Sequence, residues 1–463
     1  MPPRREAPWS GERDATAYGH RAPQLPQPPA FAPFQDIPIG EDCLVLNVWT
    51  RGIADGAKRP VMVWMHPGGF KVGTGADYTG DGTLTLKEDV VLVEVNHRLG
   101  VFGYLHLGDN DPQFAESGCA GMLDLVAALE WVRDNAAAFG GDAGNVTIFG
   151  ESGGGAKVMT LMAMPSAKGL FHRAITESGF YLKGIERPAA KKAADSLCAN
   201  LGVMPGDVRA LQRVSVDKLL VAAESVQTGL RGGFSPTVGT RSLPHHPFDP
   251  VAPQISADVP YIIGVNRDET VLLRGVMSPD RDRLFSLTEQ GLKEQLSKEY
   301  AKLSPEALDR LVEDYRYGMP NSSPSDRYFR ITSDEMMRGP SILAAERKAQ
   351  LGRAPAYLYY FTWAGATFMG HTASHHGTEQ AFTFDRLDDP TSPIKPTPQL
   401  RILADQMRGA WGAFARTGNP NHSGMPEWPP YNANERPTMV FDTPTELVSD
   451  PEAKLRLAIQ PLL

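Results

Sequence analysis

The stretch "NVTIFGESGGGA", residues 145–156, decides the fold. A short run of strand-forming residues leads into a G-x-S-x-G motif, and a helix-like run follows directly. Gly150 and Gly153 stand where a β-carbon would crowd a tight turn from strand to helix. Such a turn pushes Ser152 out at the carboxyl edge of a sheet, in a strained conformation over the positive end of the next helix. The pattern therefore predicts that Ser152 is a nucleophile.

The surrounding sequence predicts an α/β fold with a mainly parallel central sheet flanked by helices. Residues 121–142 have apolar side chains at helical spacing and lie between two apolar runs, as in a strand–helix–strand unit. Residues 185–225 and 280–350 are rich in charge and helix formers, which predicts helical insertions. We expect these insertions to form a cap over the active site. We expect a single domain over residues 1–463. The predicted strands are 43–50, 60–66, 90–96, 145–149, 260–265 and 356–363.

Composition excludes several classes of function. The chain has 463 residues, with 46 basic against 54 acidic side chains and a net charge of −8, and it lacks a basic run that could follow a phosphate backbone. This argues against a nucleic-acid partner. No apolar run approaches the roughly 18–20 residues of a membrane span. The amino terminus lacks the apolar core of a secretory signal, so a cytoplasmic location is expected.

Two further features of the chain are structural in this interpretation. The proline-rich residues 21–39 should run as an extended segment over the surface. The three cysteines are too few and too scattered for a disulfide framework or a zinc site, and we expect them to be isolated small side chains in or near the core. These cysteines are Cys43, Cys119 and Cys198.

A serine nucleophile needs a general base and an acid that orients the base, and on this fold the chain order is serine, acid, histidine. The expected strand "YIIGV" is followed by "NRDET", which offers Asp268 and Glu269 as the acid. The histidines after this point are His371, His375, His376 and His422. His422 lies in a turn-like stretch and is expected to be solvated. His371 and His375 are four apart, as metal ligands can be, but the intervening residues lack the glutamate of a zinc-protease helix. The sequence implies no metal and no cofactor.

Several blocks resemble the type B carboxylesterases, the cholinesterase-like and para-nitrobenzyl esterase-like branch of the α/β-hydrolases, and they come in that family's order. The matching segments extend from about residue 9 to the carboxyl terminus, and the helical insertions match least. The blocks are "EDCLVLNVWT" (41–50), "NHRLGVFGYL" (96–105), "LEWVRDNAAAFGGDAGNVTIFGESGGG" (129–155), "LFHRAITESG" (170–179), "GVNRDE", "HGTEQAFTF", "WGAFARTGNPN" and "WPPY".

The resemblance implies a catalytic triad of Ser152, Glu269 and His376. Glu269 is preferred to Asp268 because the family's acid follows an aspartate in this motif. His376 is preferred because Gly377 follows it directly and a glutamate stands two residues after that glycine.

The resemblance also implies supporting groups around the triad. Ser178 matches a serine that buttresses the acid, and Glu151 matches a carboxylate beside the nucleophile. The family's oxyanion hole is formed by backbone N–H groups that map onto Gly68, Gly69 and Gly153. Residues without side chains let a substrate approach such donors closely.

Three positions depart from the family pattern. The family usually has extra edge strands ahead of the segment that resembles residues 2–11, so the chain is short at its amino terminus. Cys43 matches a cysteine that is disulfide-bonded in secreted relatives, but no cysteine precedes it here, which predicts a reduced intracellular thiol. Choline-binding members have a tryptophan where this chain has Pro33 and Phe34, so a quaternary ammonium substrate would lose its cation–π partner.

The expected function is hydrolysis of small-molecule carboxylic esters through an acyl-enzyme. A non-catalytic interaction protein of the same fold is one alternative, and the presence of all three triad residues argues against it. An amidase or an acyltransferase using the same triad is another, because the choice depends on water access and pocket shape.

The glycine-rich stretch "WMHPGGFKVGTG", residues 64–75, fits this interpretation as an oxyanion loop. It lacks the glycine-lysine-threonine ending of a P-loop and the G-x-G-x-x-G spacing of a dinucleotide site. Pro67 stands where most relatives have a third glycine. Because proline has no N–H and a fixed φ, Pro67 is expected to stiffen the loop rather than to donate a hydrogen bond.

Overall fold

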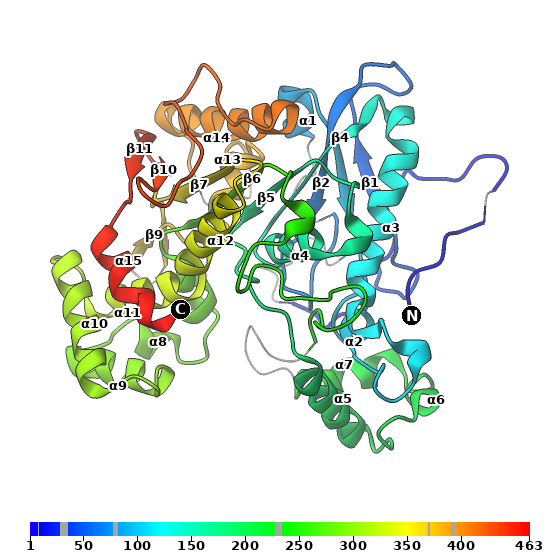
Figure 1. Ribbon diagram of the computed structural model, residues 1–463, viewed down its shortest axis with the longest axis horizontal. Helices are drawn as coiled ribbons and strands as arrows, with labels where there is room; N and C mark the ends of the chain where they lie inside the picture. The colour runs from blue at the N-terminus through cyan, green and yellow to red at the C-terminus, as the bar shows by residue number, and fades with distance from the viewer. Residues whose placement is uncertain are drawn as a thin grey trace. The chain divides into compact units, whose positions relative to one another are not determined.

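The structure of the protein is a computed structural model in which residues 1–7, 9–27, 36–76, 82–226, 234–368, 371–389, 392 and 394–463 are described. These residues pack into two units. The segments of each unit can be followed in Figure 1, which is coloured by residue number. The first comprises Met1–Thr176 with Tyr181–Pro260, and the second comprises Glu177–Phe180 with Tyr261–Leu463. In the described ranges, no helix combines the length and the apolar character that crossing a membrane requires.

The first unit is built on strands in the order β1-β3-β2-β4-β5. Strand β2 pairs in parallel with both β3 and β4, whereas β1 runs antiparallel to β3 at the edge. The central strands are buried almost throughout, because helices cover them. The strand bounds are β1 Leu46–Trp49, β2 Arg59–Met65, β3 Val91–Val95, β4 Gly141–Glu151 and β5 Arg173–Glu177.

Two helices of the first unit position the nucleophile. Helix α3 packs against β4 and against α4, and α4 contacts both β2 and β4. Along the chain, α4 follows β4 directly. Figure 1 shows α3 beside α4. The helix bounds in this unit are α1 Thr83–Glu88, α2 Gly100–Tyr104, α3 Ala120–Asn135, α4 Gly153–Ala163, α5 Arg187–Leu201, α6 Val208–Leu211 and α7 Val216–Glu224.

The second unit has the strand order β6-β7-β10-β11. Strand β7 is parallel to β6 and β10, and its side chains alternate between two covered faces. Tyr359 packs on Trp411 of α14 at 5.4 Å between ring centroids, whereas Tyr360 packs with Met336 and Met337 on the other face. The bounds are β6 Tyr261–Asn266, β7 Ala356–Phe361, β8 Ala366–Phe368, β9 His371–Ala373, β10 Pro437–Phe441 and β11 Glu446–Ser449.

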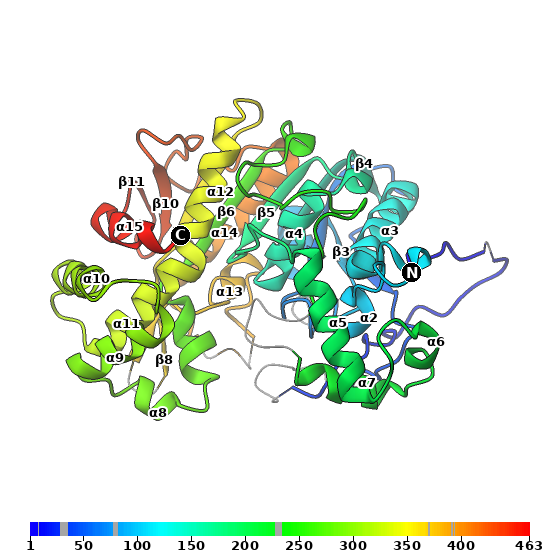
Figure 2. The same cartoon turned by 60° about the horizontal axis from the view of Figure 1, so that its bottom comes forward.

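Local sequence explains where the helices of the second unit begin and end. Helix α11 starts with a capping box between Ser323 and Asp326, and α14 starts at a Thr397 cap followed by proline and stops at Gly418 with φ 80°. In Figure 2, α8 to α11 lie together. The bounds are α8 Arg281–Leu284, α9 Glu289–Glu299, α10 Pro305–Gly318, α11 Pro324–Ser333, α12 Gly339–Gln350, α13 Gln380–Thr383, α14 Pro398–Thr417 and α15 Ala453–Ile459. Residues Val271–Val276 and Asp334–Arg338 form π-helical turns.

The structure confirms the predicted strands within a few residues, and the two segments predicted as helical insertions are largely helical. The helix expected over 121–142 is shorter, because α3 stops at Asn135 and a 3₁₀ turn follows. Strands β5, β10 and β11 and helices α14 and α15 were not predicted. The single-domain organisation and the cap over the active site stay predictions. Pro33 and Phe34 lie outside the described residues.

The expectation for the proline-rich segment is wrong in part. Its described residues form no helix, but Ala22 and Gln24 are buried rather than at the surface. Gln24 lies there because its side-chain amide brackets Gly73, donating to the Gly73 carbonyl and accepting from the Gly73 N–H, both at 2.9 Å. The cysteines are free and buried, as expected.

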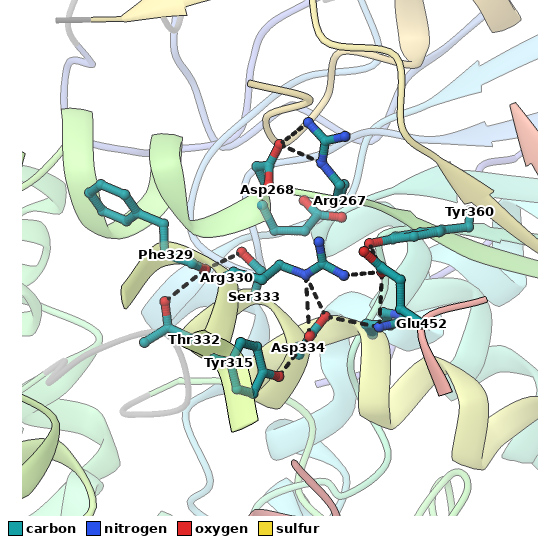
Figure 3. Close-up of polar contacts among 12 residues, drawn as sticks. Arg267, Asp268, Tyr315, Phe329, Arg330, Thr332, Ser333, Asp334, Tyr360 and Glu452 are labelled. Carbon is teal, nitrogen blue, oxygen red and sulfur yellow. Dashed lines mark hydrogen bonds and ion pairs between the residues drawn. The ribbon is translucent and has the colours of Figure 1, made fainter. Parts of the chain in front are cut away.

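A buried ion-pair cluster fixes the helices of the second unit, and Figure 3 shows its centre. Asp334 pairs with Arg330 at 3.2 Å and with Arg338 at 3.5 Å, and it accepts a hydrogen bond from Tyr315 at 2.7 Å. Glu452 also pairs with Arg330. The side chains of Asp334, Arg330 and Arg338 are at most 6% exposed, so their charges depend on one another.

We predict that Asp334→Asn destabilises the protein by about 3–5 kcal/mol, because it leaves two buried guanidinium groups short of negative charge. The measurement is chemical unfolding followed by circular dichroism. Asp309→Asn is the matched control, since its pair with Lys293 is exposed to solvent and contributes little to stability. Equal effects of the two substitutions would contradict the prediction.

Candidate functional site

Ser152 lies at the junction between β4 and α4, where the chain turns sharply. Its φ of 55° and ψ of −119° are strained for a residue with a side chain, as the nucleophile turn requires. The Ser152 carbonyl accepts the first helical hydrogen bond from Ala156 at 3.0 Å, so the serine stands at the positive end of α4. Glu151, immediately before it, is buried at the end of β4.

The glycines around Ser152 are required by close backbone approaches, as the sequence predicts. A β-carbon on Gly150 would lie 2.6 Å from the Met65 carbonyl oxygen. One on Gly153 would lie 2.2 Å from the Gly69 nitrogen. The second distance also shows that the glycine-rich loop after β2 contacts the first turn of α4, with Gly69 beside Gly153.

The loop after β2 leaves backbone donors available. Gly68 and Gly69 have φ values of 89° and 64°, and neither N–H donates to another backbone group in the part of the chain that the structure describes. Gly153 is the first residue of α4, so its N–H has no acceptor in a preceding helical turn. Pro67 contributes its carbonyl, which lies 2.8 Å from Nδ1 of His66.

In the second unit, Glu269 and His376 are in direct contact. Glu269 follows β6 and is fully buried, and its Oε2 lies 2.5 Å from Nδ1 of His376. The other carboxylate oxygen accepts from Ser178 Oγ at 2.6 Å and from the Asn266 N–H at 2.8 Å. A carboxylate at Nδ1 holds the proton there, so the neutral imidazole carries its lone pair on Nε2.

The competing acid and histidines are engaged elsewhere. Asp268 pairs with Arg267 at 3.0 Å and accepts from the Ser374 N–H at 3.0 Å, which ties the acid loop to the histidine loop. His371 binds Asp326 at 2.7 Å through Nδ1. The remaining two histidines contact backbone carbonyls, His375 that of His376 and His422 that of Gln406.

Two further buried glutamates, Glu379 and Glu177, lie near Glu269. Glu379 accepts from Ser178 at 3.3 Å and from the side-chain amide of Asn266, and burial together with the Glu269 charge raises its pKa to about 7. Glu177 accepts from Trp411 Nε1 at 2.8 Å, and burial together with the Glu379 charge raises its pKa to about 8. At neutral pH Glu177 therefore mostly keeps its proton and Glu379 is about half protonated, which limits the negative charge near Glu269.

Sequence reasoning did not identify Asn266, Glu177 or Lys157, and it used Glu379 only as a marker for His376. One signal for Lys157 was present, because it is a cation inside the otherwise uncharged run "GGGAKVMTLMA" of α4. The contacts of Glu177 and Glu379 join residues about 200 positions apart, and no local pattern carries that information.

Comparison with known proteins identifies the family. The sequence profile of the Carboxylesterase family matches residues 1–459. The chain belongs to the carboxylesterase family. It is 33% identical to the para-nitrobenzyl esterase of Bacillus subtilis, over 98% of this chain and 90% of that one. It is 32% identical to carboxylesterase 1D of Rattus norvegicus, over 94% of this chain and 81% of that one.

Solved structures agree with this assignment. Carboxylesterase EST55 of Geobacillus stearothermophilus aligns with a TM-score of 0.85 and 34% identity, over 99% of this chain and 92% of that one. The carboxylesterase thus has the α/β-hydrolase fold that its sequence predicts, and it is a serine carboxylic ester hydrolase by family.

We predict that the stability of this carboxylesterase falls as pH rises from about 4.5 to about 8, partly because of Glu177. Over that range the unfolded chain releases the Glu177 proton, whereas the folded protein, in which the pKa is about 8, retains it. Glu177→Gln replaces the acid by a neutral group of the same shape. The variant should match wild type near pH 5 and exceed it in Tm at pH 9.

Melting curves across this pH range test the prediction. Glu379, whose pKa is about 7, is still present in the variant. The fall in stability with rising pH should therefore be smaller in the variant but not absent. Parallel pH profiles for wild type and Glu177→Gln would show that Glu177 ionises normally in the folded protein.

Proposed function

We propose that the carboxylesterase hydrolyses small-molecule carboxylic esters through a Ser152–His376–Glu269 triad and a covalent acyl-enzyme. The observation that carries the proposal is the 2.5 Å contact between Glu269 and His376, because it selects one acid and one histidine among the candidates and fixes the imidazole tautomer. The strained backbone of Ser152 supports the same assignment for the nucleophile.

The reaction has two halves in this proposal. His376 Nε2 removes the proton from Ser152 Oγ as the oxygen attacks the ester carbonyl, and the imidazolium then protonates the leaving alcohol. In the second half, His376 takes a proton from water as the water oxygen attacks the acyl carbonyl, and the imidazolium then protonates Ser152 Oγ as its bond to the acyl carbon breaks and the acid is released. Glu269 orients His376 and stabilises its imidazolium in both halves.

The N–H groups of Gly68, Gly69 and Gly153 form the oxyanion hole in this scheme. Contact between the backbones of Gly69 and Gly153 supports their convergence on one oxygen. Ser178 and Asn266 act by holding the Glu269 carboxylate. The para-nitrobenzyl esterase relative makes an aryl or benzyl ester the first substrate to test.

Ser152→Ala should lower the turnover of para-nitrophenyl butyrate by at least about 10⁴-fold, because the attacking oxygen is removed. The measurement is release of para-nitrophenol, with a fluorophosphonate probe to detect the labelled serine. Ser166→Ala is the matched control, since Ser166 is an exposed serine in the turn after α4.

Undiminished hydrolysis by Ser152→Ala would refute the triad. Absence of probe labelling in folded wild type would instead favour a non-catalytic interaction protein. Turnover of a matched amide, or acyl transfer to an added alcohol, would favour the amidase or acyltransferase alternative.

Pro67→Gly should change kcat/KM by no more than about tenfold, because Pro67 has no N–H to offer the oxyanion and acts on the stiffness of the loop. Steady-state kinetics with the same ester measure this. A loss of several orders of magnitude would show that the fixed φ of Pro67 is needed to aim the following two N–H groups.

A further inference from the structure

Lys157 is a fully buried lysine on α4, the helix that begins beside the proposed nucleophile. Its side chain is 0% exposed, and its Nζ donates to the backbone carbonyl of His66 at 2.7 Å. His66 joins the end of β2 to Pro67 and so begins the oxyanion loop. Burial of an ammonium group costs several kcal/mol before its contacts compensate, so an apolar residue here would favour folding at least as well.

Two buried histidines surround this contact, and both are neutral. The rings of His66 and His97 stack with centroids 5.0 Å apart and planes 17° apart. Burial, together with the positive charge of Lys157, lowers the pKa of each imidazole well below its usual value. Neither imidazole therefore adds a positive charge beside the first peptide of the loop, which Lys157 contacts.

The peptide between His66 and Pro67 has a carbonyl but no N–H, because proline has none. Lys157 binds that carbonyl, and Nδ1 of His66 lies 2.8 Å from the next one, that of Pro67. At the far side of the loop, a β-carbon on Gly73 would lie 2.3 Å from the same Nδ1, so the loop closes tightly over the His66 ring.

Helix α4 thus reaches the oxyanion loop at two places. Its first turn touches Gly69 and the Met65 carbonyl through Gly153 and Gly154. One turn further on, Lys157 holds His66. The segment between these contacts contains Gly68, whose N–H is one of the proposed donors.

We propose that Lys157 is a positioning residue for the oxyanion hole, whose ammonium group fixes residues 66–69 against the nucleophile helix. The inference rests on the proposed function and adds a residue to it. Fixed donors stabilise a developing oxyanion because they need no reorganisation during the reaction, and a nearby buried positive charge favours the same anion. Loss of Lys157 then affects the transition state more than ground-state ester binding.

The test compares wild type with Lys157→Met, which keeps an unbranched side chain of similar length and removes the donor and the charge. We expect kcat for para-nitrophenyl butyrate to fall about 10–100-fold with KM nearly unchanged. The Ki of an aryl trifluoromethyl ketone, which forms an oxyanion on the serine, should rise by a similar factor. Thermal stability should stay equal to wild type or increase.

Thr160→Val is the matched control. Thr160 lies on the same helix, is equally buried and donates to the Ala156 carbonyl at 2.8 Å, and among the described residues it makes no hydrogen bond to residues 66–69. An equal loss of kcat and of ketone affinity in Thr160→Val would overturn the proposal, because both would then reflect general damage to α4. Unchanged kcat and Ki in Lys157→Met would also overturn it.

If Lys157→Met does not fold, Lys157→Gln, which retains a neutral donor, decides the question. A fall in kcat matched by a rise in ketone Ki supports the proposal, and unchanged values refute it. Ser152→Ala separates this result from failure of the proposed function. If hydrolysis requires Ser152 and tolerates loss of Lys157, only the inference about Lys157 fails.

Discussion

The proposed nucleophile depends on how closely the first turn of α4 approaches the end of β2. A β-carbon on Gly154 would lie 1.9 Å from the Met65 carbonyl oxygen, and one on Gly153 would lie 2.2 Å from the Gly69 nitrogen. These distances exclude side chains at both positions without movement of the backbone. The same approach forces Ser152 into its strained conformation and brings the glycine loop next to it. One packing constraint therefore places both the proposed attacking oxygen and the proposed oxyanion donors. No separate set of contacts is needed to fix each of them.

The second unit buries three glutamates, Glu177, Glu269 and Glu379, and gives each of them different hydrogen-bond partners. Glu269 receives hydrogen bonds from Ser178 and Asn266 and faces His376, so donors surround its negative charge. Glu379 and Glu177 are buried just as deeply, and burial raises the pKa of each. The three side chains are chemically identical and differ in the donors that contact them. Ser178 donates to Glu269 and lies within 3.3 Å of Glu379, so a serine outside the triad links the two kinds of carboxylate.

The sequence predicts those parts of the molecule that local patterns encode. Continuous apolar runs predict β2, β3 and β7 because strands covered on both faces need apolar side chains at every position. The G-x-S-x-G motif predicts the turn at Ser152 because its glycines report a backbone conformation. Strand β5, "RAITE", is too short and too polar to be recognised in this way. The functions of Gln24, Glu379 and Lys157 depend on contacts across many residues, and residue type alone would place all three at the surface.

Pro67 and Lys157 have a common explanation if residues 66–69 form the proposed oxyanion loop. A third glycine at position 67 would give the loop one more backbone N–H and more conformational freedom. The loop would then have more hydrogen-bond donors, but the directions of these donors would be less well defined. Proline removes that N–H and fixes φ, which leaves the His66 carbonyl as the hydrogen-bonding group of the preceding peptide. Lys157 occupies that carbonyl from the nucleophile helix. The loop is then divided into a first part held by side chains, at His66 and Pro67, and a second part left open, at Gly68 and Gly69. An anion that binds the open part meets donors already fixed in place, so the order of the loop is established during folding rather than during the reaction.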